Sequence, residues 1–437
     1  MRPITALKIG VSVAVGVLAI YGVMILAAID SLKDSPFDPP PVAPLGRAAT
    51  FEADGILETE SGYVVAGVVG TSDPHRRAPC SGRFALVFLD AQGRAERATV
   101  LSGIETSRYC ADRVDDFLPA PGRGWILAGT GVRDGGPAAL FGGRSTDFQT
   151  VTLRLDESGA LMESFGEDGL VEDHQAAGVL DGATFTTRLR RMTESGEVRD
   201  DLVVGEAAYE FWRAFEVERG FLVAVASGPG VTWQAFERDD PLVPRYHALP
   251  GATAATTNTL PLEADLGIGD TLLRDRVLYV AVRDRGGTRV NAVDPRRVRV
   301  VFGFNGTGAV RLPGYVTSER LLAAGPDGFE VATTAIDRGH HGDRLQVLRF
   351  GADGAADSSF GGRVKRKGRD VLLDPGLDDA VLDEAGRTLV LGGSTLVRLT
   401  AFGKIDPTFG RDGITRLRQV PVCELSPAAR TDPCRGA

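Results

Sequence analysis

A short phrase repeats along the chain and limits the folds that it can adopt. Its last copy, Leu396–Leu417, reads as a strand, a glycine turn, an Asp-x-Thr-Phe-Gly corner and a second strand. Similar phrases occur at 152–171 and 346–364. Repetition of this kind is the signature of an architecture in which each unit buries its apolar faces against its neighbours.

Two sub-patterns alternate between residues 50 and 417. One is a turn followed by an apolar run, as in SGYVVAG at 61–67. The other is an amphipathic strand that ends in a glycine turn, and the turn glycines are Gly93, Gly159, Gly306, Gly354 and Gly403. The last three are 48 and 49 residues apart. Such a turn needs positive φ, which glycine adopts without strain.

A unit of about 50 residues with four short strands has the size of one β-propeller blade. Arranging blades in a ring buries both faces of each sheet and leaves little exposed edge. We therefore expect an all-β fold, a β-propeller of six to seven four-stranded blades, preceded by one transmembrane helix. Six apolar runs are visible, and 176–210 is either a seventh blade or an inserted hairpin. The small residues that end the runs, such as Ala66 and Gly67, are expected near the central axis.

The repeated phrase resembles the delta-60 repeat, a bacterial β-propeller-type repeat. Three units carry the resemblance most strongly, and the others lack the Phe-Gly corner. The resemblance implies a fold and supplies no catalytic residues. The matching residues are Leu153, Arg154, Leu155, Gly159, Ser164, Phe165, Gly166 and Gly169; Leu348, Arg349, Phe350, Gly354, Asp357, Ser359, Phe360 and Gly361; and Val397, Arg398, Leu399, Gly403, Asp406, Thr408, Phe409, Gly410 and Gly413.

The amino terminus predicts a membrane anchor. Residues 9–29 contain no charge, and 21 helical residues span the hydrocarbon layer of a bilayer. Arg2 and Lys8 precede this segment, so the positive-inside rule predicts a cytoplasmic amino terminus and a periplasmic or extracellular remainder. The alternative is a signal peptide cleaved near Ala27, which yields a secreted protein.

The chain divides into four segments. Residues 1–30 form the tail and membrane helix, and 31–48 form a proline-rich linker that stays extended. Residues 49–417 form the repeat domain, and 418–437 form an irregular tail. The closing strand Ile414–Leu417 has no following blade, so we expect it to pair with the first blade and close the ring.

The cysteines predict disulfide bonds in the exported part of the chain. An even number of cysteines in an exported protein favours disulfides, and four cysteines allow three pairings. We favour Cys80–Cys110 and Cys423–Cys434, because each pair is local in sequence. None of the four has the C-x-x-C spacing of a zinc or redox site.

Paired acids are the weak candidates for a metal site. Asp115 and Asp116, and likewise Asp378 and Asp379, lie just before apolar runs, so ring symmetry would bring them to one face. There they would bind Ca²⁺ or act in acid–base chemistry. The alternative is that they accept hydrogen bonds from turn amides. His340 and His341 lie in a turn and are either solvated or metal ligands.

These observations favour a membrane-tethered, non-catalytic binding or scaffold module. We expect no cofactor and a protein or glycan partner on the propeller face. The formal net charge of −9 argues against a nucleic-acid partner. The alternative is a propeller enzyme with its active site in the central funnel, either an oxidoreductase or a glycan-cleaving enzyme. The sequence has no G-x-S-x-G or H-E-x-x-H motif, but fold alone does not decide activity.

Overall fold

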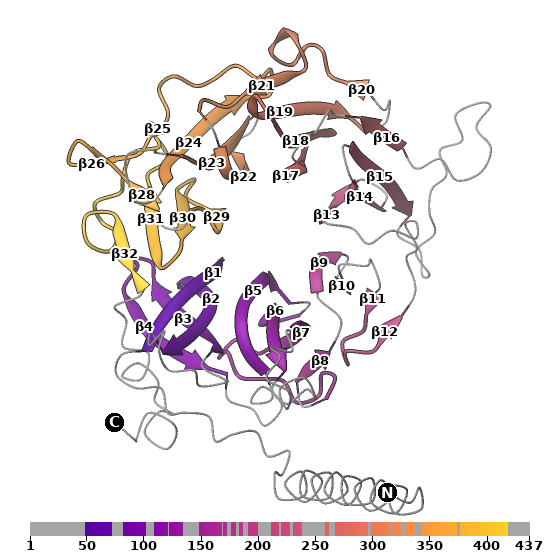
Figure 1. Ribbon diagram of the computed structural model, residues 1–437, viewed down its shortest axis with the longest axis vertical. Helices are drawn as coiled ribbons and strands as arrows, with labels where there is room; N and C mark the ends of the chain where they lie inside the picture. The colour runs from indigo at the N-terminus through magenta and orange to yellow at the C-terminus, as the bar shows by residue number, and fades with distance from the viewer. Residues whose placement is uncertain are drawn as a thin grey trace, which may run out of the picture.

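Within the part of the chain that the structure describes, seven antiparallel sheets lie in a ring around a central opening (Figure 1). This arrangement is a β-propeller, and it confirms the all-β prediction. The computed structural model describes residues 49–71, 82–101, 109–120, 122–133, 148–167, 169–172, 176–180, 183–186, 191–199, 211–217, 220–227, 230–237, 258–261, 267–295, 299–314, 316–324, 328–336, 343–373 and 376–417.

Each blade is one continuous stretch of chain, and its strands follow one another from the axis outward. The first blade is β1 (Ala49–Thr59), β2 (Gly62–Thr71), β3 (Arg83–Asp90) and β4 (Ala95–Val100). The second is β5 (Tyr109–Pro119), β6 (Trp125–Arg133), β7 (Phe148–Leu155) and β8 (Leu170–Glu172). The third is β9 (Ala176–Leu180), β10 (Ala183–Thr186), β11 (Arg191–Met192) and β12 (Val198–Arg199). Of the two alternatives for this region, the four paired strands between 176 and 199 favour a blade over an inserted hairpin.

The fourth blade is β13 (Phe211–Val217), β14 (Gly220–Ser227), β15 (Gly230–Glu237) and β16 (Asn258–Pro261). The fifth is β17 (Gly267–Arg274), β18 (Val277–Asp284), β19 (Gly287–Asp294), β20 (Arg299–Val300) and β21 (Ala309–Arg311), with the short 3-10 helix η3 (Phe304–Gly306). The sixth is β22 (Val316–Ala324), β23 (Gly328–Ala335), β24 (Asp343–Gly351), β25 (Gly362–Arg363) and β28 (Leu372–Leu373), and a separate hairpin joins β26 (Lys365–Arg366) to β27 (Arg369–Asp370). The seventh is β29 (Asp379–Leu382), β30 (Thr388–Gly392), β31 (Thr395–Leu399) and β32 (Ile414–Arg416).

The apolar runs form the second strand of each blade in which they occur, not the strand nearest the axis. In the first blade Val64, Val65 and Ala66 are fully buried, because β2 has a strand on each side and a neighbouring blade on each face. Figure 1 places β1, β5, β17, β22 and β29 nearer the axis. The expectation that Ala66 and Gly67 lie near the axis is therefore wrong.

The apolar cores lie between neighbouring blades. One cluster joins the seventh and first blades, and a second joins the first and second blades. Two further clusters join the fifth to the sixth blade and the sixth to the seventh blade. Blade-to-blade packing is therefore the source of apolar burial, at about 25 cal/mol per Å² of buried apolar surface.

The last strand does not pair with the first blade. β32 pairs with β31 of its own blade, with Leu396 opposite Thr415 and Val397 opposite Ile414. The expected closure through Ile414–Leu417 is therefore wrong, because the first blade already completes its four strands with β4. The ring is closed without strand pairing, chiefly by side-chain packing, since Leu417 is fully buried in the cluster that contains Phe51.

The predicted turn glycines all adopt positive φ, between 68° and 82°. Several of these turns also pack against an aromatic residue of the preceding blade. A Cβ on Gly93 would lie 2.4 Å from the Phe409 ring, and Gly354 and Gly403 face Phe304 and Phe360 in the same way. Glycine at these turns therefore serves both the backbone conformation and the contact between blades.

The Phe-Gly corner adds a hydrogen bond that recurs between blades. The Gly410 amide donates to the Gln92 carbonyl at 2.6 Å, which links the seventh blade to the first. The amide of Gly166 donates in the same way to Ser195 at 2.8 Å, and that of Asn305 donates to Asp353 at 2.6 Å. In each case the acceptor residue directly precedes the turn glycine of the next blade. The same type of hydrogen bond therefore recurs at three junctions between blades.

Several predictions fall on residues outside the described ranges. These are the membrane segment 9–29, the linker 31–48, the tail from 418, His340 and His341, and the side chains of all four cysteines. Across the described residues, no helix has the length and apolar character needed to cross a bilayer.

Candidate functional site

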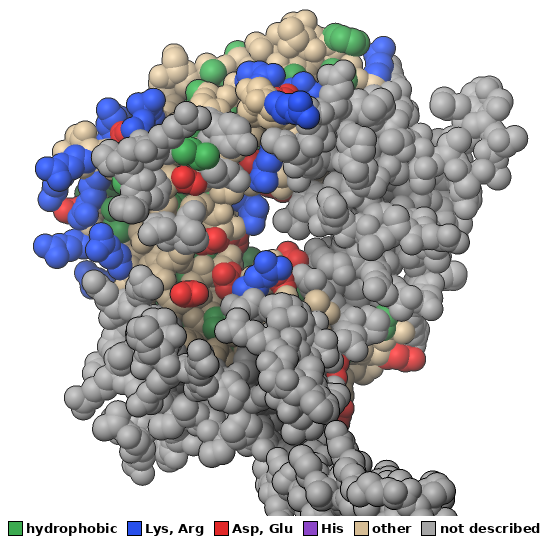
Figure 2. All heavy atoms as spheres, in the orientation of Figure 1, with side chains coloured by type: hydrophobic (Ala, Val, Ile, Leu, Met, Phe, Trp, Pro, Cys, Tyr) green, Lys and Arg blue, Asp and Glu red, His purple; other side chains and the backbone are tan. Residues whose placement is uncertain are grey.

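Acidic side chains gather around the opening at the centre of the ring, with a few basic ones among them (Figure 2). The innermost strands β1, β5, β17 and β22 carry Asp54, Asp115, Asp270 and Glu319, of which Asp270 and Glu319 are buried, and β29 begins at Asp379. This charged centre is the first candidate site.

The predicted acids lie on the inner strand β5 and at the start of β29, and Asp115 and Asp378 are both near Asp54 of β1. Asp115 accepts a hydrogen bond from the Thr130 hydroxyl and lies 2.6 Å from Arg113 Nε. Asp378 accepts the amide of Gly393. Asp115 and Asp378 therefore each have a hydrogen-bond partner within their own blade.

Asp379 links two blades. Its Oδ2 accepts the amide of Ile56 on β1 at 3.1 Å, and its Oδ1 lies 3.3 Å from Arg320 Nε on β22. Asp116 also lies on β5 and adds negative charge near Arg320. Among the described residues, no group of three or more potential ligands could hold a metal ion. The described residues therefore give no support to the hypothesis that Asp115, Asp116, Asp378 and Asp379 bind a metal ion.

The same inter-blade hydrogen bond recurs on the inner strands, and the sequence reasoning missed two of its acceptors. Asp54 on β1 accepts the Val114 amide of β5 at 2.9 Å. Asp270 on β17 accepts the Leu321 amide of β22 at 2.7 Å. The available signal was an acid one or two residues before an apolar pair, which is present in both strands. A carboxylate at this position therefore ties its strand to the next blade.

Two of these carboxyl groups have strongly raised pKa values. Burial and, to a smaller extent, the charge of Asp378 raise the pKa of Asp54 to about 7, although the hydrogen bond from the Val114 amide lowers it. Burial also raises the pKa of Asp378 to about 6, although the Gly393 amide and Arg320 oppose the shift. Both groups therefore exchange protons near neutral pH, which is the range in which a carboxyl group can act as a general acid or base.

The basic groups at the centre are held in specific pairs. Arg283 Nε lies 2.9 and 3.1 Å from the two carboxylate oxygens of Glu319, which is fully buried. Arg320 donates to the carbonyl of Asp378 at 2.6 Å in addition to its contact with Asp379. These pairs join the fifth blade to the sixth and the sixth to the seventh, so they also fix the ring.

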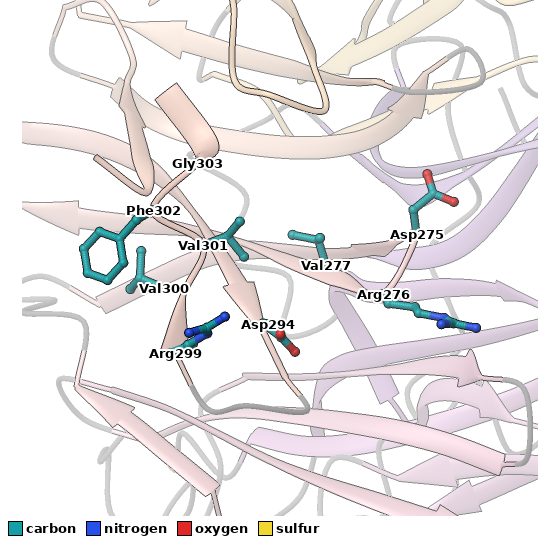
Figure 3. Close-up of a pocket in the computed structure, with 9 residues that line it drawn as sticks. All are labelled: Asp275, Arg276, Val277, Asp294, Arg299, Val300, Val301, Phe302 and Gly303. Carbon is teal, nitrogen blue, oxygen red and sulfur yellow. The ribbon is translucent and has the colours of Figure 1, made fainter. Parts of the chain in front are cut away.

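A pocket of about 560 Å³ on the fifth blade is the second candidate site (Figure 3). The Phe302 ring lies at one end, Asp275 and Arg276 lie at the other, and Arg299 and Asp294 lie between them. Its walls are the β17–β18 turn, the end of β19, β20 and the segment before η3. The Phe302 side chain is 71% exposed, so its ring faces solvent at this end of the pocket.

The β17–β18 turn beside this pocket has an uncommon backbone. Asp275 and Arg276 adopt φ of 47° and 67°, a two-residue left-handed turn without glycine. Left-handed backbone costs a non-glycine residue about 1–2 kcal/mol, and asparagine or glycine would avoid most of that cost. The turn therefore holds two charged side chains in a strained backbone beside the pocket.

A pocket of about 640 Å³ occupies the matching turns of the second blade and borders the third. Its two acidic walls come from the turn after β7 and the turn after β11. The lining residues are Gly122, Arg123, Arg154, Asp156, Glu157, Met162, Ser164, Glu194 and Ser195. The two pockets therefore lie at equivalent turns on the same face of the ring.

Comparisons with known proteins give likenesses in structure alone. No family model matches the chain, and no curated protein matches it. Among solved structures, a prolyl endopeptidase matches with 14% identity and a TM-score of 0.43 over 86% of this chain and 50% of the other. This chain thus spans about half the length of that enzyme. The β-propeller domain of the Trilobed protease from Pyrococcus furiosus, described as having an open velcro topology, matches with 10% identity and a TM-score of 0.37, over 82% of this chain and 94% of the other. The Dos1 propeller matches with 8% identity and a TM-score of 0.30, over 80% and 67%.

Proposed function

We propose that this chain is a membrane-tethered, extracytoplasmic β-propeller that binds a protein or glycan partner. The single observation that supports binding is the fifth-blade pocket, where an exposed aromatic ring and paired charges share one recess. Aromatic rings stack on sugar faces and anchor peptide side chains, and nearby charges fix orientation. The membrane tether and the delta-60 repeat are proposed from the sequence.

Site-specific crosslinking tests the binding proposal. A photoreactive residue replaces Phe302 in the full chain, which is then irradiated in native membranes. The matched control replaces Gln92, an exposed residue of a turn in the first blade. We expect a discrete adduct from position 302, whose added mass glycosidase treatment removes for a glycan partner and leaves unchanged for a protein partner. Equal labelling from positions 302 and 92 contradicts the proposal.

Fusion of alkaline phosphatase to the carboxyl terminus tests the proposed topology. The enzyme folds in an oxidising compartment, so an active fusion supports export of the repeat domain. Peptide mapping with and without reduction tests the proposed Cys80–Cys110 and Cys423–Cys434 pairs. An inactive fusion with four reduced cysteines would place the domain in a reducing compartment instead.

A second candidate function is catalysis at the central opening, by an oxidoreductase or a glycan-cleaving enzyme. The pKa of about 7 at Asp54 favours this candidate, since it matches the operating range of a general acid. Native mass spectrometry of the full chain provides the test. A small molecule that binds the wild-type protein and is lost in Asp54→Asn would favour the enzyme over the binding module.

A further inference from the structure

The sixth and seventh blades carry a concentrated basic surface. We define the basic rim as segments 362–370 and 402–416, which hold eight basic residues and three acidic ones. Figure 2 shows Lys and Arg side chains along the edge where Figure 1 places β26 and β32. The whole chain has a net charge of −9, so this local excess runs against the overall balance.

Contacts between the two segments make the basic rim one surface. Arg366 donates to the Arg411 carbonyl at 3.0 Å, and Lys367 Nζ lies 2.9 Å from Asp412. Gly403 packs against Gly361, which directly precedes the first segment. Asp412 pairs with both Arg366 and Lys367, and Asp406 is buried and bound to Arg398 outside the rim. Eight basic residues against three acidic ones still leave the rim a formal excess of five positive charges.

The β26–β27 hairpin places a lysine in a left-handed backbone conformation that lysine rarely adopts. It is a separate two-stranded element outside the seven blades. Its turn is formed by Lys367 and Gly368, with φ of 49° and 81°, and the Lys367 side chain is 78% exposed. Asparagine would fit that backbone better than lysine. Three of the five lysines of the chain lie in the basic rim, at positions 365, 367 and 404.

An exposed aromatic residue lies within the basic rim. Phe402 is 73% exposed at the tip of the turn after β31, two residues before Lys404. Surfaces that bind anionic lipids combine basic residues with an exposed aromatic ring. The basic side chains pair with the lipid headgroups, and the ring enters the membrane–water interface. The two described pockets are lined by residues of other blades.

We propose that the basic rim docks the propeller edge-on against an anionic lipid surface, with Phe402 inserted among the headgroups. This contact is separate from the amino-terminal anchor and from the fifth-blade pocket. Each Lys or Arg near an anionic membrane adds about 1 kcal/mol, which corresponds to about fivefold in the docking equilibrium. Loss of two charges should therefore weaken docking about 25-fold.

Lipid crosslinking in vesicles tests this docking. The full chain with Phe402→p-benzoylphenylalanine is reconstituted into vesicles of phosphatidylcholine alone or with 30% phosphatidylglycerol. We expect lipid adducts mainly with phosphatidylglycerol, and their loss in 0.5 M salt, since screening weakens exposed charges. Co-flotation with vesicles reports the amino-terminal anchor separately, so failure of the anchor and failure of the rim are distinguishable.

Charge variants complete the test. Lys365→Gln with Lys367→Asn removes two charges, and asparagine suits the left-handed turn, so the fold is retained. The control is Arg94→Gln with Arg123→Gln, which removes two exposed charges on the first two blades. We expect the adduct to fall in the first variant alone, with equal melting temperatures. Equal adducts in both vesicle types, no effect of the lysine variant, or a protein adduct at position 402 in native membranes overturns the proposal.

Discussion

Phe409→Ala tests the closure of the ring by side chains. Phe409 is fully buried between the last and first blades, with the Tyr63 ring 6.2 Å away and the Arg398 guanidinium 4.6 Å from its centroid. Truncation of a buried phenylalanine costs about 3–5 kcal/mol, and loss of the aromatic and cationic contacts places this site toward the upper end. We therefore expect the free energy of unfolding to fall by about 4–5 kcal/mol.

Phe360→Ala is the matched control, because Phe360 occupies the same corner one blade earlier. It is buried under the Arg349 guanidinium, 3.8 Å from the ring centroid, and faces the Gly403 turn. Denaturant unfolding of both variants measures the two junctions, and hydrogen exchange of the Gly410 amide reports local opening at the ring closure. A cost below about 1 kcal/mol for Phe409→Ala, with the full cost for Phe360→Ala, would refute closure by side chains.

Three further predictions follow from the turns and the central charges. Gly306→Ala should lower the free energy of unfolding by about 1 kcal/mol, from positive φ alone. Gly403→Ala should lower it clearly more, because its Cβ would also lie 2.5 Å from a backbone nitrogen. Denaturant unfolding curves of the two variants measure the difference. The folded pKa of Asp54 lies above its unfolded value of 3.8, so its stabilising contribution is present below pH 4 and is lost as pH rises through 7. Melting temperatures between pH 5 and 8 should fall less in Asp54→Asn than in the wild type. Arg283→Ala should cost about 3–5 kcal/mol by denaturant unfolding, because it leaves the buried Glu319 carboxylate without that partner, and Arg283→Lys should recover part of the loss.

The repeat phrase predicted much of the fold because its signals are local. The Phe-Gly corners and the turn glycines lie within a few residues of the strands that they connect, and glycine at positive φ is a sequence-level signal. The inner strands were not recognised. Asp54 and Glu319 interrupt the apolar alternation that marks a strand, since these residues serve contacts between blades.

The contacts between blades depend on residues far apart in the chain. Asp54 binds an amide 60 residues away, and Asp379 binds one 323 residues away, so no local pattern marks either pair. The fifth-blade pocket likewise depends on turns that meet only after folding. For the same reason the pairing of the last strand could not be decided from its sequence, because β4 already fills the place that it was expected to take.

Each sheet is made from one uninterrupted stretch of chain, including the last. No sheet would be divided by moving the chain ends to a junction between two other blades. A circular permutant that begins at the fifth blade, with the present ends of the domain joined by a flexible linker, would contain the same seven complete sheets and form the same junctions. For the same reason, a duplication or loss in the gene could add or remove one blade at a time, with the ring adjusting its width to the number present.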